Sequence, residues 1–196
     1  MMTNMIRNCD ELTPIEKIND SFYVKRDDLF SPYNDLCING GKLRQSIKLI
    51  ENNLNYIKNE CNNWVYTSGG ILSPQSVILA KVCKEYDINF KFFRGCTNIP
   101  KNNNLLDICE KLGGVIDTST KNVYESNLNC TINKCRENGE KFFHIKFGIN
   151  AETDRDSIIN SIAEQVYNVP NEIDTIIVPC GSCIMISGII EGCKKI

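Results

Sequence analysis

The chain has 196 residues, of which 42% are hydrophobic and 23% are charged, and its formal net charge is −2. This composition is that of a folded globular protein, and it excludes a strongly basic face for nucleic acid, which needs clustered Lys and Arg. No run approaches the roughly 18 apolar residues that span a bilayer, and residues 1–10 contain no apolar core of signal-peptide length. We therefore expect a cytoplasmic protein of one or two domains that binds neither membrane nor nucleic acid.

In the first part of the chain, a β-prone stretch at residues 22–25 ends at the charged corner Arg26-Asp27-Asp28. A loop through residues 31–41 follows. Apolar residues then recur at alternating spacings of four and three, which predicts an amphipathic helix. They are Leu43, Ile47, Ile50, Leu54 and Ile57. Lys42 and Arg44 would lie in the first turn of this helix.

The rest of the chain alternates between strand and helix patterns. Residues 64–67 predict a strand, and Ser73-Pro74 would be the N-cap and first residue of a helix that runs to residue 86. Further strands are expected at residues 89–93, 115–117 and 142–147, with helices at 105–112, 124–136 and 154–167. The apolar run 175–178 is typical of a strand inside a parallel sheet, and a turn at 179–182 leads into a helix at 184–190. This alternation predicts an α/β protein with parallel sheets.

Three glycine turns could hold a ligand, because ligands of open α/β sheets bind where turns expose backbone N–H groups at helix N-termini. In the first turn, Lys42 could form a Schiff base with an aldehyde cofactor, or it could be a solvated lysine at a helix start. In the second, Ser73 could contact a substrate carboxylate or relay a proton, and it could equally cap its helix. In the third, Gly181 and Ser182 precede a helix whose positive end favours phosphate, although a plain turn has the same residues.

Taken together and in order, these motifs resemble the fold-type II pyridoxal-phosphate (PLP) enzymes of the tryptophan synthase β superfamily. The motifs are Thr13-Pro14-Ile15, the stretch from Tyr23 to Leu29, Gly40-Gly41-Lys42-Leu43-Arg44, Thr67-Ser68-Gly69-Gly70 with Ser73, and the stretch from Val178 to Gly188. Among these enzymes, the chain is most similar to 1-aminocyclopropane-1-carboxylate deaminase and D-cysteine desulfhydrase. The resemblance covers nearly the whole chain.

The resemblance implies two open, mostly parallel sheets with flanking helices and PLP as the cofactor. Lys42 matches the lysine that forms the Schiff base and moves the α-proton of the substrate. Ser73 matches the active-site serine, while Gly181 and Ser182 match the start of the phosphate cup. The implied reaction is elimination or deamination of a small amino acid.

The chain also departs from the pattern of these enzymes. Relatives have Asn-His after the serine, where this chain has Pro74-Gln75, and Gln75 could take the place of the Asn that contacts the ring hydroxyl of the cofactor. Relatives continue the phosphate cup with two glycines and a threonine, where this chain has residues 183–185, although Ser187 and Gly188 keep the small pair that follows. Relatives also extend beyond this loop. We therefore expect an incomplete large domain that is completed by a homodimer or by a partner chain.

The resemblance further implies a cofactor-binding large domain made of residues 1–50 and 148–196, and a small α/β domain made of residues 51–147. A second hypothesis is a fold that has lost catalysis and serves as a binding or assembly module.

The eleven cysteines, in a chain that we expect to be cytoplasmic, are expected to be free thiols. A third hypothesis takes Cys180 and Cys183, with Cys193 nearby, as a redox or metal-binding pair whose helix start lowers the thiol pKa. Against a metal site, the segment offers too few clustered ligands, and the only histidine, His144, lies in an apolar strand run and is expected to be structural. We therefore expect no metal.

Overall fold

The computed structural model describes residues 8–33, 37–95, 104–119, 125–150, 154–181 and 183–195, and it leaves the side chains of 125–127 undescribed. The chain divides into two compact units. Unit 1 comprises Met1–Leu49 and Glu152–Ile196, and unit 2 comprises Ile50–Ala151. The assignment of a cofactor-binding role to one domain and a smaller role to the other stays a prediction.

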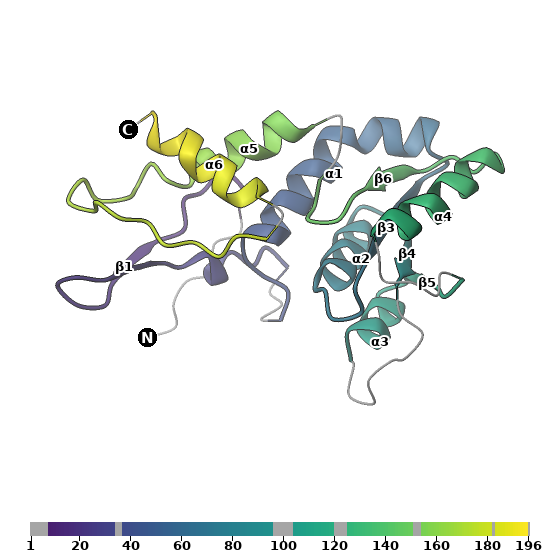
Figure 1. Ribbon diagram of the computed structural model, residues 1–196, viewed down its shortest axis with the longest axis horizontal. Coiled ribbons are helices and arrows are strands. Elements are labelled where there is room, and N and C mark those ends of the chain that lie inside the picture. The colour runs from purple at the N-terminus through teal and green to yellow at the C-terminus, as the bar shows by residue number, and fades with distance from the viewer. Residues whose placement is uncertain are drawn as a thin grey trace. The chain divides into compact units, whose positions relative to one another are not determined.

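Unit 2 is built on a four-stranded parallel sheet (Figure 1). Its strands are β3 (Trp64–Gly69), β4 (Asn89–Arg94), β5 (Val115–Asp117) and β6 (Phe143–Ile145), in the order β5-β4-β3-β6. The helices between them are α2 (Gln75–Glu85), α3 (Asn104–Lys111) and α4 (Glu125–Glu137). This arrangement confirms the predicted α/β class with a parallel sheet and flanking helices.

Aromatic and β-branched residues on both faces of β3 and β4 explain why this sheet forms. Successive side chains of a strand point to opposite faces, so Tyr66 and Phe93 face α4, where they pack with Leu128 and Ile132 in one buried cluster. The Tyr66 ring stacks on Phe142, with 4.0 Å between ring centroids. Both sheet faces are therefore covered, as parallel sheets require.

The order of the strands creates a switch point in unit 2. The chain passes from β3 through α2 to β4 and then to β5 on one side, whereas β6 returns to pair with the other side of β3. In open α/β sheets, ligands bind beyond the carboxyl ends of the two strands at such a point. The segments that follow β3 and β6 begin at Gly70 and Lys146, and the first of them carries Ser73.

Helix α1 (Gly41–Glu60) confirms the helix that was predicted from apolar spacing. Four of the five predicted apolar positions are buried, and Leu54 is half-buried. Its residues up to Leu49 belong to unit 1 and those from Ile50 to unit 2. Lys42 lies in its first turn, as expected.

Unit 1 joins a short antiparallel pair to helices from the other end of the chain. Strands β1 (Ile15–Lys17) and β2 (Tyr23–Lys25) are followed by the 3₁₀ turn η1 (Asp27–Leu29). Helices α5 (Arg155–Glu164) and α6 (Ile184–Cys193) pack against one another. Gly188 and Gly192 allow this packing, because a Cβ atom on Gly192 would lie 2.5 Å from the Ala163 carbonyl oxygen.

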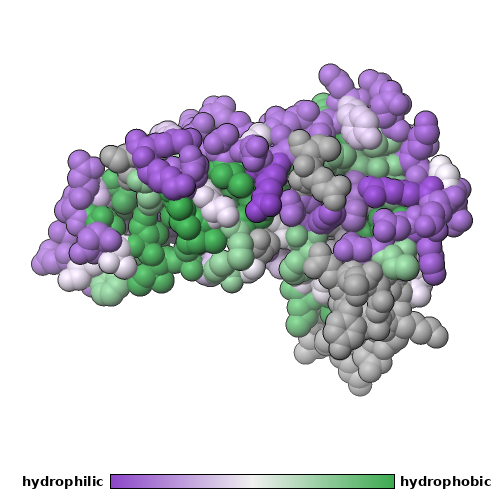
Figure 2. Space-filling model, turned by 45° about the horizontal axis from the view of Figure 1, so that its top comes forward, coloured by the Kyte–Doolittle hydropathy of each residue, from purple (hydrophilic) through white to green (hydrophobic). Residues whose placement is uncertain are grey.

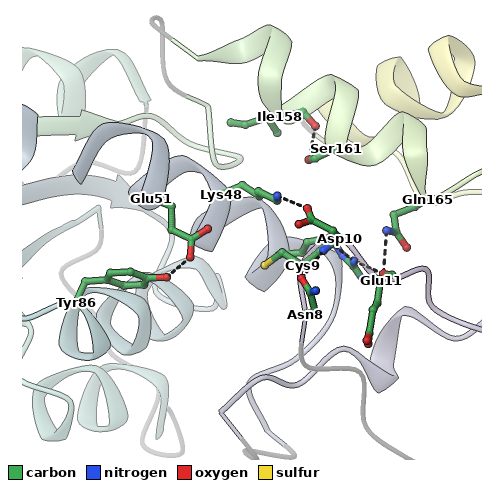
Figure 3. A network of polar contacts seen from close by, with 11 residues as sticks. Asn8, Cys9, Asp10, Glu11, Lys48, Glu51, Tyr86, Ile158, Ser161 and Gln165 are labelled. Carbon is green, nitrogen blue, oxygen red and sulfur yellow. Dashed lines mark hydrogen bonds and ion pairs between the residues drawn. The ribbon is translucent and has the colours of Figure 1, made fainter. Parts of the chain in front are cut away.

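The N-terminal segment of unit 1 is held to α1 and α5 by polar contacts (Figure 3). Arg44 is buried, with its guanidinium 4.2 Å from the centroid of the Phe30 ring. Its Nη1 donates to the carbonyl oxygens of Cys9 and Glu11 at 2.7 and 2.8 Å. Gln165 of the turn after α5 donates to the same Glu11 carbonyl at 3.2 Å. Arg44 therefore ties the first turn of α1 to the N-terminal segment.

The strand predicted at residues 175–178 is wrong: these residues form no strand in the structure. Ile177 is 85% exposed and Ile176 is 42% exposed. A central parallel strand needs a hydrogen-bonded neighbour on each edge, and the described part of unit 1 supplies none beside this run. The second parallel sheet is therefore not formed by the described residues, and Figure 2 shows apolar side chains exposed on the surface of unit 1.

Two smaller differences concern element ends. Strand β6 covers only Phe143–Ile145 of the predicted run 142–147, and α5 ends at Glu164 instead of residue 167. Helix ends fray, and strand ends are set by where the neighbour stops pairing, so neither is fixed by local sequence. Within the described ranges, no helix has the length and apolar character to cross a membrane.

Candidate functional site

The first turn of α1 presents Lys42 to solvent from a firmly anchored helix start. The N–H groups of Leu43 and Arg44 donate to the Gly40 carbonyl oxygen at 3.0 and 3.2 Å, and Gly40 has a φ of +83°, which favours glycine. Leu43 and Arg44 are buried, whereas Lys42 is exposed. No hydrogen bond or ion pair within the described part of the chain involves the Lys42 Nζ atom. The amine is therefore accessible to an aldehyde.

The start of α1 lies against the start of α6 within unit 1. A Cβ atom on Gly41 would lie 3.1 Å from Met185 Cε and 3.2 Å from Asp27 Oδ2. Asp27 is held in place by the Thr13 hydroxyl, which donates to its Oδ1 at 2.7 Å. The turn that carries Lys42 and the first turn of α6 are thus neighbours, which sequence spacing alone does not reveal.

The start of α6 offers free backbone donors. The first helical bond runs from Ser187 N to the Cys183 carbonyl oxygen, so the N–H groups of residues 184–186 have no partner inside the helix. Gly181 is exposed, and none of the described atoms lies within 4 Å of where its Cβ would be. Space, free donors and the positive helix end together fit an anion such as phosphate.

The other predicted residues of this turn differ in their availability. The Ser187 hydroxyl donates to the Cys183 carbonyl oxygen at 2.8 Å, so only its oxygen lone pairs remain for a ligand. Ser182 lies outside the described residues. Cys183 has a φ of +63°, the left-handed conformation that glycine favours. The chain therefore keeps a glycine-like backbone at this point without a glycine.

In unit 2, Ser73 lies between β3 and α2 and is half-buried. Helix α2 begins at Gln75, one residue later than predicted, and the Ser73 Oγ accepts the Gln75 N–H over a long 3.4 Å. This weak cap leaves the hydroxyl able to donate elsewhere. Ser73 therefore caps α2 weakly at the switch point of the sheet, and its role toward a substrate stays a prediction.

Gln75 has a structural position that the sequence did not suggest. It is fully buried, and its Nε2 donates to Thr67 Oγ1 at 2.8 Å and to the Lys146 carbonyl oxygen at 3.1 Å. Its Oε1 accepts the Gly148 N–H at 2.8 Å. Both amide donors are used, so contact with a cofactor hydroxyl would have to use the remaining lone pair of Oε1 or break one of these bonds. Its cofactor-binding role stays a prediction.

Sequence reasoning missed the part that Asp27 plays at the start of α1. Asp27 and Asp28 point to different partners, as expected for adjacent residues, because Asp28 pairs with Arg26 at 2.8 Å while Asp27 faces Gly41 and Thr13. The only available signal was the position of Asp27 inside the stretch from Tyr23 to Leu29, one of the motifs of the resemblance. A carboxylate next to the Lys42 turn gives that turn negative charge.

The cysteine pair lies at the same helix start. Cys180 and Cys183 are both exposed, and their Sγ atoms are 3.7 Å apart. The predicted lowering of the thiol pKa is wrong for Cys183: hydrogen bonding to Cys180 and the charge of that residue raise the pKa of Cys183. Over the described ranges, no three metal-ligating side chains cluster, and His144 lies in β6 opposite Tyr66.

Comparison with known proteins shows which proteins have a similar sequence or fold. No family model matches the chain. A curated relative, the O-seryl-dTMP PLP-dependent decarboxylase of Salmonella phage ViI, is 26% identical over 200 residues, which cover 93% of this chain and 45% of the phage protein. The solved ACC deaminase homologue matches with a TM-score of 0.69 and 20% identity, over 93% of this chain and 56% of that one. Cysteine synthase from Entamoeba histolytica matches with a TM-score of 0.69 and 13% identity, over 100% of this chain and 59% of that one.

These matches show that the chain has the fold of the fold-type II PLP-dependent enzymes. The chain spans about half the length of the relatives it matches, between 45% and 59%. Its fold is accordingly incomplete relative to theirs, which agrees with the absence of a second parallel sheet from the described residues.

Proposed function

We propose that this chain binds PLP through Lys42 and takes part in PLP-dependent chemistry on a small amino acid. The observation that carries the proposal is the proximity of Gly41 to Met185, because a Cβ atom on Gly41 would lie 3.1 Å from Met185 Cε and the Lys42 turn therefore lies beside the start of α6. A reactive amine and a phosphate-binding turn are the two features that PLP needs, and they come from sequence positions more than 130 residues apart. The phage relative, which is named as PLP-dependent, supports the same cofactor.

Each candidate residue has a role that its surroundings permit. Lys42 Nζ would hold the aldehyde carbon of the cofactor and then move a substrate proton. Gly181, Ser182 and the first N–H groups of α6 would hold the phosphate, and Ser187 would join them only if its hydroxyl left the Cys183 carbonyl oxygen and donated to the phosphate. Ser73 would donate to the substrate carboxylate. When bound, PLP supplies an electron sink for bonds at the substrate Cα atom.

Two reaction classes are compatible with this set of residues. Elimination or deamination, as in the enzymes that the sequence resembles, needs a base for the α-proton, and Lys42 is such a base. Decarboxylation is the second candidate, because the phage relative is named as a decarboxylase. Ammonia release and carbon dioxide release, measured with small amino acids after cofactor loading, distinguish the two classes.

The first experiment is the visible absorption of the purified protein with added PLP, followed by borohydride reduction and peptide mass mapping. PLP reacts with many surface lysines, so the matched control is Lys58→Ala, which removes another exposed lysine from the same helix. We expect an absorption band and a reduced adduct at residue 42 in the wild type and in Lys58→Ala, and neither in Lys42→Ala.

Pyridoxal, which lacks the phosphate, tests the second half of the proposal. Charge-assisted hydrogen bonds contribute roughly 1.5–3 kcal/mol, so pyridoxal should bind at least about tenfold more weakly than PLP. Equal affinity would remove the phosphate site from the proposal.

A folded protein that forms no adduct at all would favour the alternative of a binding or assembly module without catalysis. We also propose that the active form is a homodimer or a complex with a completing chain, in the cytoplasm. Sedimentation of the protein with and without PLP measures its oligomeric state.

A further inference from the structure

We propose that Cys180 and Cys183 form a dithiol site that closes to an intrachain disulfide in the presence of a low-molecular-weight disulfide such as glutathione disulfide. The two residues flank the turn that leads into α6. This inference does not depend on PLP binding, because it concerns two side chains that the proposed cofactor site does not use.

The first argument is geometric. The two Sγ atoms are 3.7 Å apart and both side chains are exposed, so a soluble oxidant can reach either sulfur. A disulfide bond requires about 2.05 Å, so the sulfurs must approach by a distance that side-chain rotation in an exposed turn can supply. Neither thiol is locked into a buried environment that would oppose this movement.

The second argument is the backbone of Cys183. Its φ of +63° belongs to the left-handed region, which is strained for a residue with a Cβ atom and unstrained for glycine. Nothing in the packing of α6 requires a side chain there, since Cys183 is exposed. A strained backbone that carries a reactive side chain is typical of functional positions, and here it aims one thiol at the other.

The chemistry balances with the oxidant that we name. The step begins with the thiolate of either exposed cysteine, written here for Cys180. It attacks glutathione disulfide, forms a mixed disulfide and releases one glutathione thiolate. Cys183 then loses its proton and attacks the Cys180 sulfur, which expels the second glutathione. The two protein thiols lose two electrons, and the glutathione disulfide gains them.

The other cysteines that the structure describes differ from Cys180 and Cys183 in burial or in having no neighbouring thiol on the same turn, so their reactions with glutathione disulfide can be told apart. Cys61, Cys83 and Cys109 are buried, and burial raises the pKa of each thiol, so they react slowly. Cys193 is exposed at the end of α6 and provides a matched single thiol on the same helix.

The experiment equilibrates the native chain with glutathione disulfide, blocks the remaining thiols by alkylation and cleaves after glutamate. Cleavage at Glu172 and Glu191 releases residues 173–191, which contain Cys180 and Cys183 but not Cys193. We expect this fragment to be two hydrogens lighter than the reduced fragment and to carry neither an alkyl group nor glutathione. Addition of dithiothreitol should restore two alkylation sites.

Two variants and a control complete the test. Cys180→Ser and Cys183→Ser should each leave one thiol that becomes alkylated or carries a single glutathione, whereas Cys193→Ser should form the disulfide like the wild type. A wild-type fragment that carries two separate glutathiones, or two alkyl groups at saturating oxidant, overturns the inference.

Discussion

At the scale of single residues, the sequence predicted where Lys42 lies but not what surrounds it. Its place in the first turn of α1 follows from the glycine turn and the apolar spacing behind it, both of which are local. The approach of Gly41 to Met185 joins two residues that are far apart in the sequence, and no local pattern encodes it. Gln75 shows the same limit, because two of its three partners, Lys146 and Gly148, lie 71 and 73 residues away in the sequence.

The hydrogen bonds of Gln75 lead to a prediction about stability. In Gln75→Leu, the Gly148 N–H, the Lys146 carbonyl and the Thr67 hydroxyl each lose their hydrogen bond to residue 75, although Thr67 Oγ1 still donates to the Ile145 carbonyl and the Lys146 carbonyl still accepts from the Asn150 N–H. A lost hydrogen bond costs about 0.5–1.5 kcal/mol, so we expect the three together to cost about 2–4 kcal/mol. Urea denaturation measures this loss in the free energy of unfolding.

The control is Asn55→Ala, an exposed change in the same unit, which should shift the free energy of unfolding by less than about 0.5 kcal/mol. A stable Gln75→Leu protein would show that these bonds contribute little.

Lys25 leads to a prediction about pH. Its Nζ donates to the Thr13 carbonyl oxygen and to Asn168 Oδ1, both at 2.8 Å, and desolvation lowers its pKa to about 8 from 10.5, although nearby Asp27 opposes the shift. Between these two values, the unfolded chain binds a proton that the folded chain does not. The contribution of Lys25 to the free energy of unfolding therefore rises with pH from about 8 toward 10.5.

Unfolding of the wild type and of Lys25→Met, compared between about pH 7 and 9, measures this contribution. The free energy of unfolding of the wild type should rise relative to that of Lys25→Met as pH rises. The slope of this difference should stay below the roughly 1.4 kcal/mol per pH unit that one titrating group can give. Comparison with Lys58→Met, an exposed lysine on α1, corrects for ordinary lysines. A constant difference across this range would mean that Lys25 titrates normally.

At the scale of elements, helices were predicted well and one strand was not. A helix satisfies its own backbone, so the apolar spacing of α1 was sufficient. Residues 175–178 have the composition of a central strand, but a strand exists only where neighbours pair with it. Strand β5 is the useful contrast, because a run of only three residues does form a strand where β4 pairs with it.

The contact between α5 and α6 depends on two glycines, and Gly192 tests it. A Cβ atom there would lie 2.5 Å from the Ala163 carbonyl oxygen and 2.9 Å from Val166 Cγ2, so the helices would have to separate. Overpacking costs about 1–3 kcal/mol, whereas alanine gains about 1 kcal/mol over glycine in helix propensity. The contacts of the added Cβ are short, so we expect the cost to lie near the upper end of its range and to exceed the gain. We expect Gly192→Ala to lower the thermal midpoint, whereas Cys193→Ala, its exposed neighbour, should leave it unchanged. Equal midpoints would indicate that α6 can shift without cost.

At the scale of the whole molecule, the order of the motifs along the chain was more informative than any single motif. The parallel sheet, the start of α1 and the start of α6 all follow from that order, and the fold agrees with the structures that the chain matches. The absence of a second parallel sheet from the described residues could not be predicted from the apolar run 175–178, because the sequence of a strand does not show which segments pair with it. What the ordered motifs could predict was therefore the architecture and the lysine, but not the completeness of the sheet.

The two proposals meet at the start of α6, and this gives the last prediction. Phosphate bound to the N–H groups of residues 184–186 would restrain the turn that must contract when Cys180 and Cys183 join. We therefore expect saturating PLP to slow disulfide formation several-fold, and oxidised protein to bind PLP more weakly by a corresponding factor, because coupling between two sites is reciprocal. Pyridoxal, which lacks the phosphate, should slow disulfide formation much less than PLP does.

The rate of loss of the two thiols in the 173–191 fragment, with and without PLP, measures this coupling. Lys42→Ala separates its two possible causes, because it removes attachment of the aldehyde but leaves the phosphate-binding turn intact. Protection that persists in Lys42→Ala at high PLP concentration would locate the effect at the turn. A disulfide that forms equally fast with and without PLP would support the dithiol site and contradict phosphate binding at the start of α6. No disulfide with or without PLP would contradict the dithiol site and leave the phosphate proposal as it was.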